Sequence, residues 1–273
     1  MTTQTPSLGR RGLLRALLGG AALAALPRAA RADEAAASDP PRRVLLLGDS
    51  MIAGALGLFL ENGLRQLHGY QVKRHGKSST GLARPDFFDW MKEAERQVAA
   101  FPEPDAVVAM FGGNDVQGLY MGKGEWIRWN EDGWDQEYAA RITRFADIVA
   151  PGGRPLFWIG MPVMRPEKFH ARVQKVNTIA RAEMAIRPGG RFVDIWRLLA
   201  DEAGNYADRL ALGDGPKPKK VRVRAGDGIH LSIAGADLVE GHVRSVVVAH
   251  LDGRDGLLAE GDAPADLALP ITG

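Results

Sequence analysis

Three short segments of the sequence carry side chains that could act together in nucleophilic chemistry. They are residues 48–50 (Gly-Asp-Ser), residues 112–115 (Gly-Gly-Asn-Asp) and residues 227–230 (Asp-Gly-Ile-His). A serine hydroxyl becomes a good nucleophile when a base takes its proton, and a histidine oriented by a carboxylate commonly does this. Ser50, His230 and Asp227 supply these three groups. The segments therefore predict a site for serine acyl transfer.

Each segment alone has a simpler explanation. Ser50 could be only a helix N-cap, His230 a packing residue, and segment 112–115 a turn. Position favours the joint interpretation, because the first two segments directly follow strand-like apolar runs and the third lies on a glycine-rich loop before a helix. Such loops converge on one edge of an α/β sheet, where helix N-termini favour an oxyanion.

The elements that must position these residues alternate along the chain. Strand-like runs are expected at 44–48, 70–74, 106–111, 156–160 and 192–195. Helical patterns are expected at 51–67, 86–100, 136–149, 166–186 and 232–250. This alternation predicts a single three-layer α/β/α domain with a mostly parallel central sheet.

At these residues the chain resembles the SGNH hydrolases, also called the GDSL family of serine esterases, in order and nearly end to end. The resemblance implies their flavodoxin-like fold. It implies that Ser50 is the nucleophile, His230 the general base and Asp227 the residue that orients the base. It also implies an oxyanion hole made of the Ser50 backbone N–H, a glycine N–H and the Asn114 side-chain amide.

Two glycines compete for the oxyanion role, because segment 75–82 departs from the Gly-Asp pattern common in the superfamily. We predict Gly81, whose setting before residues 82–86 resembles a bacterial exported cell-envelope branch of the superfamily. Gly76 is the alternative and would otherwise simply end a strand. Asp49 is expected to support the turn beside Ser50, and Asp115 is expected to be structural.

The segment 116–134 is rich in aromatic residues and glycines. We predict that it forms a substrate wall over the site rather than a regular helix. The residues of this wall would be Tyr120, Trp126, Trp129 and Trp134. Aromatic rings beside an oxyanion donor suit stacking on sugars, whereas the alternative is that they pin an insertion to the domain.

The N-terminus predicts export. Residues 1–32 hold five arginines, no acidic residue, an apolar stretch and the A-x-A cleavage pattern Ala30-Arg31-Ala32. The pair Arg10-Arg11 resembles a twin-arginine signal, with a general secretory signal as the alternative. We expect a linker at 33–41, the hydrolase domain at 42–251 and an irregular tail at 252–273. The mature protein would be periplasmic or extracellular, with no transmembrane anchor.

Without the signal, the chain has 30 basic and 33 acidic residues. The net positive charge of the full sequence therefore comes from the leader. Nothing then favours a nucleic-acid partner. We expect a solvated hairpin at the basic cluster Lys217, Lys219, Lys220, Arg222 and Arg224. The chain has no cysteine, and its histidines lack metal-ligand spacing, so no metal or cofactor is predicted.

The predicted activity is that of an exported serine esterase without a cofactor. Its substrate would be an acylated carbohydrate or a small ester, with O-acetyl groups of cell-envelope polysaccharide or peptidoglycan foremost. A lysophospholipase or an O-acyltransferase could use the same residues, since an acyl-enzyme does not dictate its acceptor. A carbohydrate-binding adaptor without turnover is a further alternative, although it would not need Ser50, Asn114, Asp227 and His230 together.

Overall fold

The computed structural model describes residues 40–213 and 219–254. The predicted signal at 1–32, linker residues 33–39 and tail residues 255–273 lie outside this part of the chain, as does Lys217. Among the helices described, none combines the length and the apolar character that crossing a bilayer requires.

A five-stranded sheet in the order β2-β1-β3-β6-β7 forms the centre of the domain, and all its strands are parallel. The strands are β1 (Arg43–Gly48), β2 (Gln71–Gly76), β3 (Ala106–Met110), β6 (Leu156–Ile159) and β7 (Gly190–Val193). The residues of β3 and β6 are all buried. Strands covered on both faces show continuous apolar runs rather than alternation, which is why the sequence revealed them.

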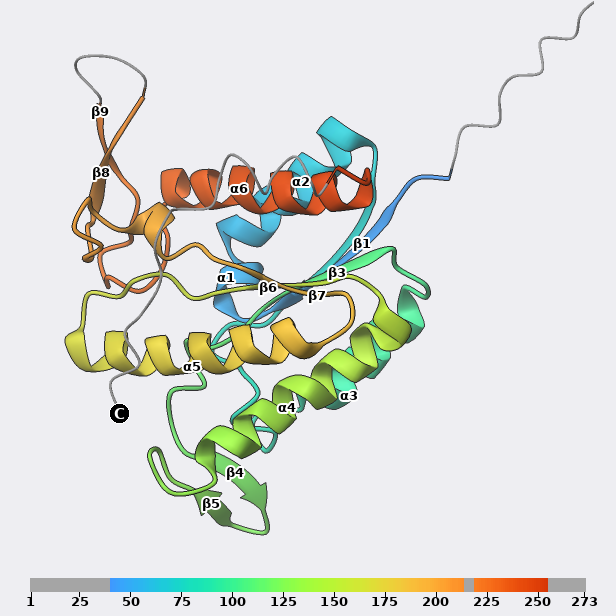
Figure 1. Ribbon diagram of the computed structural model, residues 1–273, viewed down its shortest axis with the longest axis vertical. Helices are drawn as coiled ribbons and strands as arrows, with labels where there is room; N and C mark the ends of the chain where they lie inside the picture. The colour runs from blue at the N-terminus through green and yellow to red at the C-terminus, as the bar shows by residue number, and fades with distance from the viewer. Residues whose placement is uncertain (1–39, 214–218, 255–273) are drawn as a thin grey trace, which may run out of the picture. The chain divides into compact units, whose positions relative to one another are not determined.

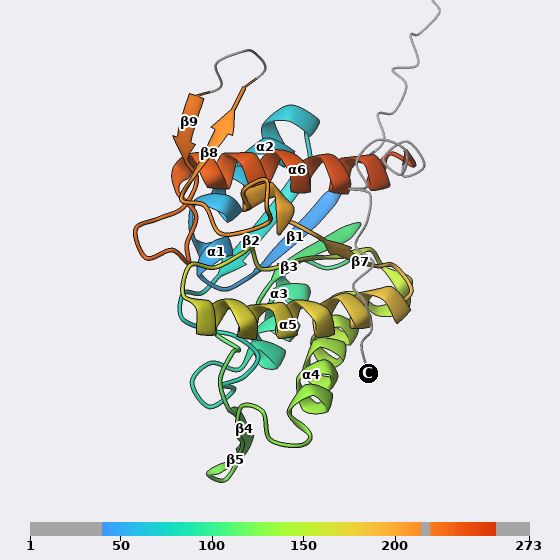
Figure 2. The same cartoon turned by 60° about the vertical axis from the view of Figure 1, so that its left-hand side comes forward.

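Helices cover both faces of this sheet. They are α1 (Ser50–Ala53), α2 (Ala55–His68), α3 (Trp90–Ala100), α4 (Trp134–Val149), α5 (Glu167–Ile186) and α6 (Ile233–Leu251). Helices α2 and α6 lie on one face, and α3, α4 and α5 lie on the other (Figures 1 and 2). The predicted three-layer α/β/α architecture is confirmed. The helix expected at 51–67 is split, because Gly54 adopts an extended conformation between α1 and α2.

The strand order places a crevice beside β1. The chain runs from β1 outward to β2, then returns to β3 on the other side of β1 and continues to β6 and β7. Gly48 pairs with Met110, so β1 and β3 end side by side. Open α/β sheets bind ligands at such a switch point, outside the carboxyl ends of the strands. Segments 48–50 and 112–115 both leave the sheet there.

Smaller elements decorate the domain. They are hairpin β4 (Leu119–Gly122) with β5 (Glu125–Ile127), hairpin β8 (Arg209–Leu212) with β9 (Lys219–Arg222), and 3-10 turns at Pro151–Gly153 and Arg197–Leu199. The segment 116–134 therefore contains an antiparallel hairpin and no helix before Trp134. The predicted basic hairpin is β8–β9, where Lys219, Lys220 and Arg222 are exposed.

An aromatic cluster anchors the segment that follows β3. Phe111 makes edge contacts with Trp90 (centroids 4.8 Å apart) and Phe145 (5.1 Å), and a tilted contact with Trp158 (5.7 Å). All four rings are buried. Burying such a side chain stabilises the fold by about 1.5–3 kcal/mol. Because Phe111 directly precedes segment 112–115, this packing fixes where that segment starts.

Candidate active site

Ser50 stands at the turn between β1 and α1. Asp49 is the N-cap of α1, and its Oδ1 accepts the N–H of Met51 at 2.9 Å. Gly48 is required just before the turn, since a Cβ there would lie 2.5 Å from the carbonyl oxygen of Met110 and 2.6 Å from Cγ1 of Ile52. The close approach of β1, β3 and α1 thus presents the Ser50 hydroxyl at the sheet edge.

The structure brings Ser50, His230 and Asp227 into one hydrogen-bonded chain. The Oγ of Ser50 lies 2.9 Å from Nε2 of His230, although 180 positions separate the two residues. On the other side of the ring, Nδ1 lies 2.6 Å from Oδ2 of Asp227. The second carboxylate oxygen, Oδ1, accepts the backbone N–H groups of Ile229 (2.8 Å) and His230 (2.9 Å). Asp227 therefore fixes both the loop and the ring.

The environment of Asp227 keeps its carboxyl group ionised. Burial would raise its pKa, but the hydrogen bond with the His230 side chain and those from the N–H groups of Ile229 and His230 outweigh burial and lower the pKa to about 2. A permanent negative charge at this position suits the stabilisation of an imidazolium that forms when His230 takes a proton.

Asn114 faces the same space from the end of β3. Its Nδ2 donates to the carbonyl of Thr80 at 2.9 Å and lies 3.4 Å from Oδ2 of Asp49. The second contact is long for a hydrogen bond. One amide hydrogen is thus held in place by Thr80, and the other is only weakly engaged.

A cavity of about 160 Å³ opens at Ser50. It is lined by Asp49, Ser50, Met51, Gly113, Asn114, Met161, Phe169, Ile229 and His230. The lining thus combines polar groups with the four apolar side chains of Met51, Met161, Phe169 and Ile229. Within the described residues, no group of three or more histidine, aspartate or glutamate side chains could hold a metal ion.

A family model matches residues 43–246 of this chain, and it is described as a protein of unknown function, DUF459. The chain belongs to the DUF459 family. No curated protein matches the sequence.

Solved structures similar to this DUF459 protein show its fold. An alpha/beta hydrolase enzyme from the metagenome of Lake Arreo, Spain, is 17% identical with a TM-score of 0.54, covering 78% of this chain and 96% of that one. A carbohydrate acetylesterase from Sinorhizobium meliloti is 17% identical (TM-score 0.50; 77% and 99% covered). An acetylxylan esterase mutant from Geobacillus stearothermophilus is 15% identical (0.51; 74% and 92%). These structures share the α/β/α fold that the sequence predicts for this chain.

Arg224 is a residue of the site that the sequence did not reveal. The prediction that it belongs to a solvated hairpin is wrong, because its side chain is fully buried. The guanidinium donates to the carbonyl oxygens of Val163 and Ile229, the latter at 2.8 Å, and more weakly to that of Gly228. Burial lowers the pKa of Arg224. It clamps the loop of Asp227 and His230 to the segment after β6.

Removing this clamp should destabilise the fold. In Arg224→Met, the carbonyl groups of Val163 and Ile229 remain buried without a donor, so we expect the free energy of unfolding to fall by about 3–5 kcal/mol. Urea unfolding measures this loss. The matched control is Arg222→Met, whose side chain is exposed and whose effect should stay within about 0.5 kcal/mol. Equal effects of the two variants would refute the clamp.

The two candidate oxyanion glycines, Gly76 and Gly81, are closely packed against neighbouring atoms. Gly76 ends β2, and a Cβ there would be 2.2 Å from the N atom of Ala53. A Cβ on Gly81 would be 2.2 Å from Oδ1 of Asp115. Both positions thus require glycine for close packing. Neither belongs to the lining of the Ser50 cavity described above. The glycine N–H of the oxyanion hole therefore stays a prediction.

Asp115, the residue after Asn114, is a buried carboxylate. It accepts the N–H of Ala83 at 2.7 Å and the hydroxyl of Tyr138 at 3.0 Å. Burial raises its pKa to about 6, and burial likewise raises the pKa of Asp49 to about 7, with the charge of Asp115 adding to the effect. Both carboxylates hold backbone N–H groups, in keeping with the structural roles expected of them.

The raised pKa of Asp115 predicts a pH-dependent stability. Between its ordinary value of 3.8 and about 6, the folded protein keeps a proton that the unfolded chain has lost, so the carboxyl group lowers stability as the pH rises. Asp115→Asn still accepts from Ala83 and can donate to Tyr138. The stability of this variant relative to the native protein should therefore rise by up to about 1.4 kcal/mol per pH unit in that window. Urea unfolding at several pH values measures it, and parallel curves would contradict it.

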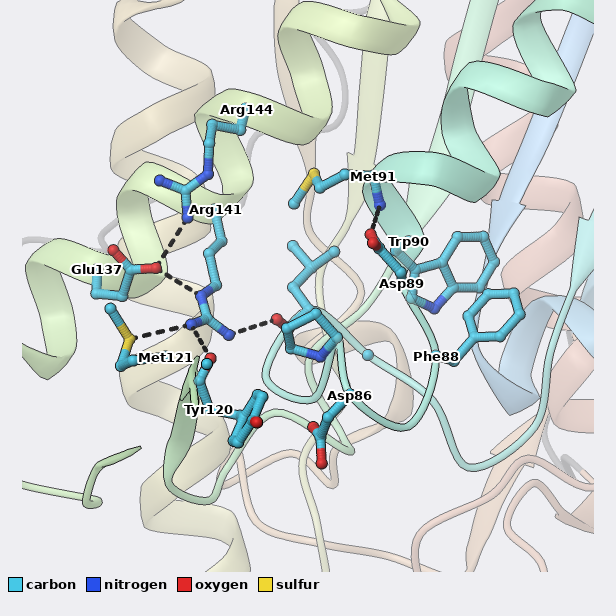
Figure 3. Close-up of a pocket in the computed structure, with 14 residues that line it drawn as sticks. Asp86, Phe88, Asp89, Trp90, Met91, Tyr120, Met121, Glu137, Arg141 and Arg144 are labelled. Atoms are coloured by element: carbon cyan, nitrogen blue, oxygen red, sulfur yellow. Dashed lines mark hydrogen bonds and ion pairs between the residues drawn. The ribbon is translucent and has the colours of Figure 1, made fainter. Parts of the chain in front are cut away.

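Arg141, on α4, holds residues 82–83 and strand β4 together (Figure 3). It donates to the carbonyl oxygens of Leu82 (2.9 Å), Ala83 (3.0 Å) and Tyr120 (2.7 Å), and it pairs with Glu137 at 2.7 Å. Arg141 and Tyr120 line the cavity drawn in Figure 3, which shares no lining residue with the cavity at Ser50.

The predicted aromatic wall does not line the Ser50 cavity. The prediction that Trp134 contacts substrate is wrong, because its side chain is fully buried. The indole stacks on Tyr138 and donates its Nε1–H to the carbonyl of Gln117 at 2.8 Å. Its apolar area fixes the start of α4. Trp126 is 42% exposed, and Trp129 is half-buried. These two rings line hollows of their own beside hairpin β4–β5.

Proposed function

We propose that this protein is a serine esterase that removes O-acyl groups, acetyl in particular, from cell-envelope polysaccharide or peptidoglycan. The observation that carries the proposal is the hydrogen-bonded chain from Ser50 through His230 to Asp227. Each link has the length of a normal or charge-assisted hydrogen bond, 2.9 and 2.6 Å. The α/β/α fold adds support, because this arrangement lies at the edge of the sheet where such folds bind ligands.

In the proposed reaction, Oγ of Ser50 attacks the carbonyl carbon of the ester while Nε2 of His230 takes the hydroxyl proton. The Ser50 N–H, the Asn114 amide and a glycine N–H, from Gly81 or Gly76, would bind the oxyanion. The intermediate collapses as His230 gives its proton to the leaving alcohol. His230 then takes a proton from the water molecule that attacks the acyl group on Ser50. It gives this proton to Oγ of Ser50 as the bond to the acyl carbon breaks and the acid is released.

The size of the cavity supports a short acyl group. Its volume of about 160 Å³ is small beside the roughly 300–1,000 Å³ of sites that bury drug-sized ligands. A carbohydrate substrate is suggested by two structural neighbours, a carbohydrate acetylesterase and an acetylxylan esterase. The composition of residues 1–32 supports export, which N-terminal sequencing of the secreted protein would test by finding a start after Ala32.

Hydrolysis of a series of nitrophenyl esters tests the proposal. Acetate should be cleaved fastest, butyrate more slowly and palmitate not at all, since a cavity of about 160 Å³ is too small for a long acyl chain. Fastest cleavage of palmitate would favour a lysophospholipase. Acetyl transfer to an added sugar in preference to water would favour an O-acyltransferase. If no ester is hydrolysed, the result would favour the carbohydrate-binding adaptor.

Asn114→Ala should lower kcat strongly while changing KM little. Loss of one oxyanion-hole donor costs about 10²–10³-fold in kcat in a serine protease, because the donor acts on charge that develops in the transition state. Initial-rate kinetics with nitrophenyl acetate measure the effect. Gln117→Ala is a control on the same turn, because Gln117 donates to the carbonyl of Asn114. A kcat that survives in Asn114→Ala would remove Asn114 from the oxyanion hole.

A further inference from the structure

Basic side chains follow one face of α5 from its N-terminal end. Lys168, Arg172 and Lys175 are spaced by four and three residues, which places them on one side of the helix. Arg165 lies just before Pro166, the N-cap of α5. Arg165 donates to the carbonyl of Gly226 at 2.9 Å, directly before Asp227. Phe169, which lines the Ser50 cavity, neighbours Lys168. The row of cations therefore begins at the proposed active site.

Trp129 holds two of these cations. The guanidinium carbon of Arg172 and Nζ of Lys175 each lie 5.1 Å from the centre of a Trp129 ring. A cation–π contact fixes a charged group without an opposite charge that would cancel it. Arg172 also donates to the carbonyl of Val116, which leaves its charge intact. Lys175 differs, because Asp135 pairs with it at 2.5 Å.

Two hollows meet at Trp129, and each contains a further cation. Lys168 and Arg172 line the first, of about 280 Å³, and Arg128 lines the second, of about 400 Å³. Lys168 and Arg128 are exposed, and within residues 40–213 and 219–254 no carboxylate pairs with either side chain. The Glu131 carboxylate accepts the backbone N–H of Arg128.

This local positive charge contrasts with the rest of the chain, since residues 33–273 hold 30 basic and 33 acidic residues. A hollow lined by one sign of charge concentrates ligands of the opposite sign. The aromatic ring adds a second requirement. An indole packs against the apolar face of a sugar ring, while a guanidinium or ammonium group pairs with a carboxylate on that sugar.

We propose that the Trp129 face, made of Arg128, Trp129, Lys168 and Arg172, binds carboxylate-bearing sugars of an acidic acylated polysaccharide. The same polysaccharide would present its ester to Ser50. This second statement rests on the proposed esterase function. Binding of the acidic sugars does not depend on turnover.

Calorimetry with an oligogalacturonate that carries no ester tests the proposal without any need for catalysis. The comparison ligand is the same oligosaccharide with its carboxyl groups reduced to alcohols. We expect the native protein to bind the acidic form about tenfold more tightly, as a few exposed ion pairs would allow. Concentrated salt should erase the preference, because the screening length falls to about 3 Å at 1 M.

The double variant Arg128→Gln/Lys168→Gln should lose the preference for the acidic ligand. Lys219→Gln/Lys220→Gln on hairpin β8–β9 makes the same charge change and should retain it. Equal affinity of the native protein for both ligands, or equal losses in the two variants, would overturn the proposal. Selective binding without hydrolysis of any ester would instead sustain it and refute the esterase function. Hydrolysis of acetylated acidic and neutral oligosaccharides without selective binding would do the opposite.

Discussion

Ser50→Ala should abolish both covalent labelling by a fluorophosphonate probe and ester hydrolysis. The probe forms a bond between its phosphorus and the serine oxygen as fluoride leaves, which requires a base to take the hydroxyl proton. In this protein Nε2 of His230 lies within hydrogen-bonding distance of that hydroxyl. Loss of the nucleophile in a serine protease lowers kcat by about 10⁶-fold, and we expect an effect of that order.

Intact-mass measurement and peptide mapping would locate the adduct on the native protein. Ser245→Ala is the matched control, because Ser245 is an exposed serine whose hydroxyl donates only to the carbonyl of His242 on α6. It should be labelled as fast as the native protein. Labelling that survives in Ser50→Ala, or its absence from the native protein, would refute the serine esterase proposal and favour the adaptor.

Asp227→Asn should lower kcat by about 10⁴-fold while leaving the fold intact. The loop holds the new side chain in one orientation, because its oxygen must accept the N–H groups of Ile229 and His230. The amide nitrogen then takes the place of Oδ2 and donates to Nδ1 of His230. This forces the ring proton onto Nε2, so the ring cannot accept the proton of Ser50.

Asp201→Asn provides the matched control for this substitution. The Oδ1 of Asp201 also accepts hydrogen bonds from two backbone N–H groups, those of Ala203 and Asn205. Unlike Asp227, Asp201 is not hydrogen-bonded to a histidine in the part of the chain that the structure describes. Its activity should equal that of the native protein. Full activity of Asp227→Asn would mean that another acid orients His230. Since the pKa of Asp227 is held near 2, protonation of this carboxyl group should not limit kcat/KM above about pH 3.

The central sheet could be predicted because burial on both faces leaves a direct mark on the sequence. The runs at β1, β3 and β6 are continuous and apolar, so the predicted positions of these strands were correct to within one residue at every end. The hairpin β4–β5 was missed, since its strands have only four and three residues and three of their side chains face solvent. Short, exposed strands carry little periodicity.

The candidate site divides in a similar way. Ser50, Asn114, Asp227 and His230 stand in short segments at element ends, and their joint meaning follows from where parallel strands end. Arg224 shows the limit of this reasoning. In the sequence Arg224 is the last of a run of basic residues, and such a run normally indicates a solvent-exposed segment. Only the folded chain reveals that its side chain turns inward to the carbonyl groups of Ile229, on the next loop, and of Val163, far away in the sequence.

The sequence by itself thus determined the α/β/α layers and the residues that meet at the end of β1. Apolar runs mark the buried strands, and parallel strands bring the segments that follow them to one edge of the sheet. The tertiary structure decided which tryptophan is buried, which arginine is a clamp and which cations surround Trp129. These outcomes depend on side-chain packing between segments far apart in the chain. Trp134 and Trp129 illustrate this, since they are five positions apart, one in the core and the other beside two open hollows.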